Sequence, residues 1–114
     1  MRNGDLTQLP RLANRWRVDT DAAYDAKVRR AFLVDDRLVS IPAQAKKRDV
    51  ILRYLLDACF PEDRDYPEKE VNQRLALFHR DVAALRRYLV DARLMTRASG
   101  IYRRTNPPAE ARRA

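Results

Sequence analysis

The sequence predicts a mainly α-helical domain that ends in a small β hairpin. The chain has 114 residues, which suits a single domain, and 46% of them are apolar, enough to form a core. It contains only two glycines, whereas an all-β fold needs many for its tight turns. Long runs rich in Ala, Leu, Arg and Asp favour helices instead.

Residues 1–19 form a basic leader, in which we expect a short helix that docks on the domain. Pro10 suits the first turn of a helix. Four apolar residues follow it or flank it at helical spacing: Leu9, Leu12, Ala13 and Trp16. Trp16 is more often a packing residue than a binding residue, so docking is the favoured interpretation.

The next two predicted helices supply most of the core. A helix from about 20 to 33 places Tyr24, Val28 and Phe32 on one face. Asp35 and Asp36 then make a turn, and a short β-prone stretch runs from 37 to 42. The helix from about 43 to 60 has the widest apolar face and should form the centre of the core. That face consists of Ile51, Leu52, Leu55, Leu56, Ala58 and Cys59.

Residues 61–70 are a polar break with two prolines. A short helix starts within this stretch, near Pro67 or Glu68, and ends near Ala76 or Leu77. The two glutamates suit its positive N-terminal end. Three apolar residues at helical spacing should pack inward: Val71, Leu75 and Phe78.

A further helix begins near Arg80 and leads into the hairpin. Its apolar side consists of Val82, Leu85, Leu89 and Ala92. Two β-capable runs, 94–97 and 101–104, flank a three-residue loop that ends in Gly100. We expect Leu94 and Ile101 to face the core. The arginines of the hairpin should face water: Arg97, Arg103 and Arg104. Residues 105–114 are polar with a Pro-Pro stop, and we expect a disordered tail.

This order of elements matches a winged helix-turn-helix over residues 20–104, with a scaffold helix, a tight helix pair and a β wing. A three-helix core with an incidental hairpin is the competing interpretation.

The net charge of +8 is concentrated near the end of the domain. Residues 80–104 carry seven arginines and two aspartates, which is an electrostatic footprint for phosphate. Small alanines permit close approach to DNA, and arginines reach phosphates or guanine edges. The candidate DNA-contacting residues are Arg80, Ala83, Ala84, Arg86, Arg87, Arg97, Arg103 and Arg104.

Structural explanations compete for two of these arginines. Arg87 has Asp91 four residues later and could form an ordinary helix ion pair with it. Arg86 could bridge to an acid of the neighbouring helix, such as Glu70. Under either explanation the arginine braces the fold and does not contact DNA.

Several spaced motifs resemble the family catalogued as domain of unknown function 2087. They are RLVSIPAQAKKRDVILRYL, YPEKEVNQRL, FHRDVAALRRYLVDARLMTR and GIYRR, within residues 22–104. The family has no assigned reaction, and the resemblance implies a winged-helix-like fold associated with transcriptional regulators. The sequence departs from the family at Asp36, at Pro67, where Ser or Thr would cap a helix, and at Ala92-Arg93, where the turn lacks its usual glycine.

No catalytic constellation is visible, so we expect neither an enzyme, a metal nor another cofactor. The single histidine, His79, is more consistent with helix capping than with a site, because metal sites need three or four clustered ligands. The single cysteine cannot form an internal disulfide, and no apolar run approaches a membrane span. A cytoplasmic location is therefore expected, with no membrane or small-molecule partner.

The expected function is binding of double-stranded DNA, as a transcriptional regulator and with a homodimer as a possible form. The alternative is a protein-interaction module of the same fold, which would bind DNA only feebly and without sequence preference.

Overall fold

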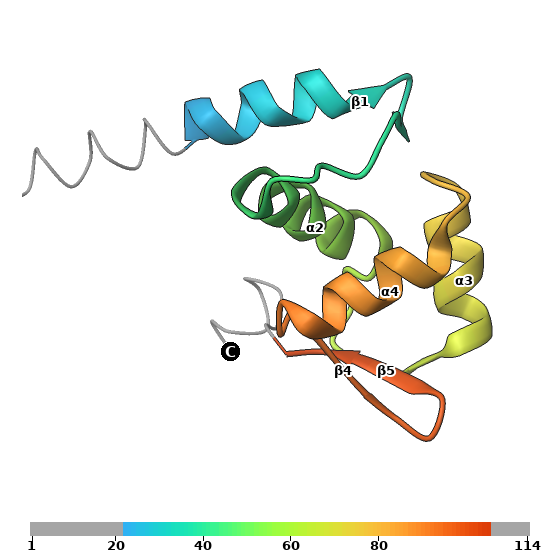
Figure 1. Cartoon of the computed structure of the whole chain (residues 1–114). Coiled ribbons are helices and arrows are strands. Elements are labelled where there is room, and N and C mark those ends of the chain that lie inside the picture. The colour runs from blue at the N-terminus through green and yellow to red at the C-terminus, as the bar shows by residue number, and fades with distance from the viewer. Residues whose placement is uncertain (1–21, 106–114) are drawn as a thin grey trace, which may run out of the picture.

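The computed structural model describes residues 22–105, and the predicted docking leader and all of the predicted disordered tail except residue 105 lie outside this range. A helix over residues 22–32 leads into the remaining elements (Figure 1). In chain order these are β1 (Leu33–Val34), β2 (Arg37–Leu38), α2 (Ala45–Cys59), β3 (Tyr66–Pro67), α3 (Glu68–Ala76), α4 (Val82–Asp91), β4 (Met95–Ala98) and β5 (Ile101–Arg104). The prediction of a mainly helical fold with a small β hairpin is confirmed.

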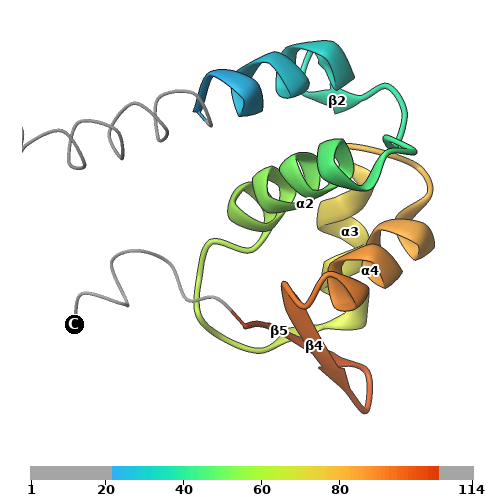
Figure 2. The same cartoon turned by 60° about the vertical axis from the view of Figure 1, so that its left-hand side comes forward.

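Helix α2 lies at the centre of the described domain. In both views the helix at 22–32 lies on one side of α2, and the β4–β5 hairpin lies on the other (Figures 1 and 2). The wide apolar face predicted for α2 is confirmed, with the exception of Ala58, which is exposed. Its buried residues are Val50, Ile51, Leu52, Leu55, Leu56 and Cys59.

The hairpin belongs to a three-stranded antiparallel sheet of order β3-β5-β4, and β3 was not predicted. Tyr66 of β3 pairs with Tyr102 of β5, and both rings are buried. The expectation that Ile101 faces the core is wrong, because its exposure is 38%. Leu94 is partly buried and packs against the core as expected, and the buried apolar residues of the two strands are Met95 and Tyr102. Successive residues of a strand face opposite sides, so an error of one residue exchanges the two faces.

A second small hairpin, β1–β2, was also not predicted, although its turn was. Asp35 and Asp36 form that turn with φ angles of 52° and 62°. The backbone N–H of Leu38 donates to the carbonyl of Phe78 at 2.8 Å, which attaches this hairpin to the segment after α3. Because β1 pairs with β2, the helix predicted for residues 20–33 ends at residue 32. The β-prone stretch predicted for residues 37–42 is reduced to the two residues of β2.

Helices α3 and α4 form a tight pair, whose inward residues are largely those predicted. Val71 and Leu75 of α3 are fully buried, as are Leu85 and Leu89 of α4. Asp81 caps α4, because its side chain accepts a hydrogen bond from the backbone N–H of Ala84. The pair therefore fixes which side of α4 is left facing solvent.

Helix α4 ends in a Schellman motif that turns the chain into β4. The N–H of Leu94 donates to the carbonyl of Leu89, and that of Arg93 donates to the carbonyl of Val90. Arg93 itself has a φ of 63°, a conformation that glycine adopts more easily. The missing family glycine is thus replaced by an arginine in the left-handed region.

Candidate nucleic-acid interface

A stripe of two arginines around a small residue runs from the segment before α4 onto the outer side of the helix. Ala83 and Arg87 are exposed on the side of α4 opposite the buried Leu85 and Leu89, and Arg80 is exposed in the bend two residues before the helix begins. The predicted polar side of this helix is therefore present. Ala84 lies nearer the flank of the stripe, because it is half-buried.

The positive charges of this stripe have no carboxylate partner in the described part of the chain. Neither Arg80 nor Arg87 forms a salt bridge within residues 22–105, and the proposed helix pair between Arg87 and Asp91 is not formed there. A cation that no neighbouring acid neutralises retains its full attraction for phosphate.

Arg86 projects from the flank of α4 toward α3, where its Nη1 donates to Oδ1 of Asn72. The expected brace to the neighbouring helix is present, but its partner is a neutral amide. Glu70, the acid considered for this role, accepts from Arg64 and pairs with Arg74 at 2.8 Å. The Nε of Arg86 is buried and has no hydrogen-bond partner among the described residues, which costs about 1–3 kcal/mol.

Two of the hairpin arginines are exposed as predicted, but both are paired with acids. Arg97 lies 3.3 Å from Glu68, the first residue of α3. Arg103 lies 3.1 Å from Asp63 and 3.0 Å from Asp65. These contacts attach the hairpin to the loop and helix start that precede it in the chain. Much of the positive charge of the hairpin is neutralised at short range.

Arg104 does not face water, and this prediction is wrong. Its side chain is 4% exposed. Nη1 donates to the carbonyl of Phe60 at 2.6 Å, and Nη2 donates to Asp57 at 2.9 Å. Because β5 alternates its faces, Arg104 lies on the same side as the buried Tyr102. It braces the sheet against the end of α2 and is unavailable to DNA.

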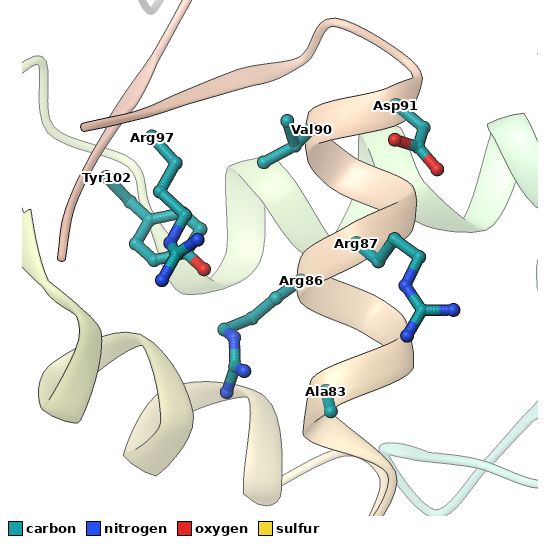
Figure 3. Close-up of a pocket in the computed structure, with 7 residues that line it drawn as sticks. All are labelled: Ala83, Arg86, Arg87, Val90, Asp91, Arg97 and Tyr102. Atoms are coloured by element: carbon teal, nitrogen blue, oxygen red, sulfur yellow. The ribbon is translucent and has the colours of Figure 1, made fainter. Parts of the chain in front are cut away.

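A pocket of about 280 Å³ lies between α4 and the β4–β5 hairpin. Its lining is Ala83, Arg86, Arg87, Val90, Asp91, Arg97 and Tyr102. Figure 3 shows Arg86 and Arg97 extending toward the same space from α4 and from the hairpin. Arg87 and Asp91 project from the other flank of α4. The hydroxyl of Tyr102 donates to Glu68 at 3.3 Å.

The single histidine and the single cysteine both have structural roles. The Nδ1 of His79 accepts a hydrogen bond from the backbone N–H of Asp81 at 3.0 Å, so His79 supports the start of α4 as predicted. Cys59 is buried, and desolvation raises the pKa of its thiol to about 11 although Arg74 opposes this shift. Within residues 22–105, no group of three or more metal-ligating side chains is found.

None of the helices described within residues 22–105 combines the length and the apolar character needed to cross a bilayer.

A family model matches residues 37–104, more than half of the chain, from β2 to the end of β5. The chain belongs to the DUF2087 family. That family is described as an uncharacterized protein conserved in bacteria. Neither curated proteins nor solved structures gave a match to this chain.

The DUF2087 match includes every candidate DNA-contacting residue and leaves the helix at 22–32 outside it. The contacts of Asn72, Glu68 and Asp57 with Arg86, Arg97 and Arg104 were not predicted, and Glu68 was expected only to suit the N-terminal end of its helix. Asn72 belongs to one of the quoted family motifs, and that was the only signal for it. The acids at 57 and 68 carried no local signal, because their partners lie far along the chain.

Proposed function

We propose that this DUF2087 domain binds double-stranded DNA as a winged helix-turn-helix, with α4 in the major groove, and acts as a transcriptional regulator without catalysis. The observation that carries the proposal is the exposed stripe at α4, in which Arg87 and Arg80, the latter just before the helix, flank Ala83 without a carboxylate partner in the described residues. The order helix, strand, helix pair and hairpin, with strand order β3-β5-β4, is that of winged helices and supports it.

The chemistry of the stripe suits a groove. The major groove is about 12 Å wide and admits an α-helix. Ala83 permits close approach of the backbone of α4, and Arg87 can reach a phosphate or the paired acceptors of a guanine. Arg97 and Arg103 are paired with carboxylates, so each would have to exchange its carboxylate for a phosphate before it could add to the attraction for DNA. Their proposed role is therefore to orient the hairpin.

The proposed form is a cytoplasmic dimer. A single winged helix presents one short reading helix, so two copies on adjacent half-sites give a longer contact. The unpaired, buried Cys59 agrees with a reducing compartment.

Fluorescence anisotropy of a labelled duplex, titrated at several salt concentrations, tests the proposal. Three arginines on or just before α4 lack a carboxylate partner in the described chain, so we expect a slope of log K against log[salt] near −3 per domain, at about −0.9 per phosphate. Arg87→Ala should weaken binding roughly tenfold near 0.1 M salt and reduce the slope by about one. Arg30→Ala is the matched control, since it removes an exposed charge from the helix on the other side of α2.

The proposal fails if the duplex does not bind at low salt with ~10⁻⁴ M protein, a concentration at the weak end of the usual range of non-specific dissociation constants. The site assignment alone fails if Arg87→Ala and Arg30→Ala weaken binding equally.

A protein-interaction module of the same fold is the second candidate, and exposed apolar residues favour it. Val34, Val39 and Leu77 are 53%, 63% and 68% exposed. The Nη1 of Arg37 donates to the carbonyl of Leu77, so the β1–β2 hairpin and the end of α3 lie together. This candidate predicts self-association or a protein partner in sedimentation experiments, with only feeble binding to any duplex.

A further inference from the structure

We propose that the pocket between α4 and the β4–β5 hairpin is a phosphate-binding site, and that Arg86 is its fixed cationic contact. The proposal rests on the proposed function for the source of the phosphate, which is the DNA backbone. The chemistry recognised is the phosphate group itself, and a small phosphate ester would present the same group.

The geometry of a duplex places a backbone at this position. The major and minor grooves are separated by one sugar–phosphate strand. If α4 lies in the major groove and the hairpin lies at the adjacent minor groove, that strand must pass between them. The pocket is the hollow between these two elements, and Arg86 and Arg97 extend into it from either side (Figure 3).

Arg86 is held in place without losing its charge. Its Nη1 is fixed by the amide oxygen of Asn72, which is neutral, whereas the three hairpin arginines are each fixed by a carboxylate. The remaining Nη donors of this guanidinium have no acceptor among the described residues and are the donors that a phosphate would meet, because the unpartnered Nε is buried. A planar guanidinium with free donors matches the paired oxygens of a phosphate.

Arg97 supplies the opposite side of the site. Its guanidinium lies 5.8 Å from the centre of the Tyr102 ring and 3.3 Å from Glu68. An entering phosphate competes with Glu68 for Arg97, whereas it takes nothing from the amide that holds Arg86. Asp91 also lines the pocket, but its carboxylate projects from the other flank of α4, away from Arg86 (Figure 3).

The sharpest variant is Asn72→Asp, which keeps the shape of the Arg86 partner and makes it a carboxylate. We expect the domain to fold with an unchanged or higher melting temperature. Duplex affinity should fall roughly tenfold near 0.1 M salt, and the salt slope should fall by about one. Gln73→Glu is the matched control, because it makes the same charge change at the adjacent, exposed position of α3. Equal losses for the two variants would overturn the site.

Inorganic phosphate, titrated alone and followed by the ¹H–¹⁵N resonance of the Arg86 Nε–H, separates this proposal from the previous one. A saturable shift in the wild type that is lost in Asn72→Asp supports the site. If that shift occurs while the duplex does not bind, the site stands with a small phosphate ester as its source, and the DNA-binding proposal fails. If the duplex binds but neither the shift nor the Asn72→Asp loss is seen, the site is refuted and DNA binding remains.

Discussion

Arg104 is predicted to stabilise the fold and to make no contact with DNA. Replacing it by Met keeps a long apolar stem and removes the guanidinium. The carbonyl of Phe60 then loses a charged donor at 2.6 Å, which costs about 1.5–3 kcal/mol. The pair with Asp57 adds at most about 1 kcal/mol, because that carboxylate is 74% exposed and stays hydrated. We expect Arg104→Met to lower the free energy of unfolding by about 2–4 kcal/mol.

Urea and thermal unfolding followed by circular dichroism measure this loss. At about 4–8 °C per kcal/mol for a domain of this size, the melting temperature should fall by roughly 8–32 °C. Arg103→Met is the matched control one residue earlier. Its side chain is 47% exposed, so breaking its pairs with Asp63 and Asp65 should cost less than about 1 kcal/mol.

The reasoning is refuted by either of two results. One is an Arg104→Met protein that melts within a degree or two of the wild type. The other is a variant that is folded and stable but binds the duplex more weakly than the wild type does, since Arg104 would then be a contact.

Two further predictions concern the end of α4 and the start of α3. Arg93→Gly should stabilise the domain by about 0.5–1 kcal/mol, because glycine relieves the φ of 63° in the Schellman motif, and Arg93→Lys should not; a urea midpoint for Arg93→Gly at or below that of the wild type would contradict this. The hydrogen bond from Arg64 holds the pKa of Glu70 below its usual range, so the stabilisation by this carboxylate is present at neutral pH and is lost as the pH falls through the lowered pKa. Glu70→Gln should therefore lower the melting temperature at pH 7, and this effect should shrink as the pH falls through the lowered pKa, whereas an effect that stays constant with pH would show that the charge is not involved.

The helices could be predicted from the sequence because their apolar residues follow one period. Leu85 and Leu89, or Val71 and Leu75, leave no alternative face to bury. The hairpin sequence does not indicate which face is buried, because Leu94 and Met95 are both apolar, as are Ile101 and Tyr102. The pattern permits either register. Contacts outside the hairpin decide it, with β3 pairing to β5 and the Schellman turn setting where β4 begins.

The candidate site was only partly predictable for a similar reason. The helical wheel placed Arg80, Ala83 and Arg87 on the outer side of one helix. Ala83 and Arg87 lie there, but α4 begins at Val82 and leaves Arg80 in the bend before it. It could not distinguish Arg103 from Arg104, which are adjacent and chemically identical. Their partners lie at Asp65 and at Asp57, the latter 47 residues earlier. Contacts over such distances depend on the tertiary fold and leave no local pattern.

Charge counted along the chain differs from charge presented at a surface. Residues 80–104 have an excess of five positive charges, but the acids that neutralise the hairpin lie between residues 57 and 68, within a longer stretch, residues 43–79, that carries seven basic and seven acidic residues. Folding brings those acids to Arg97, Arg103 and Arg104. The uncompensated charge of this segment then lies on α4 and at the edge of the pocket. A phosphate approaching this side of the domain therefore meets α4 first, and the hairpin positions the helix more than it adds to the attraction.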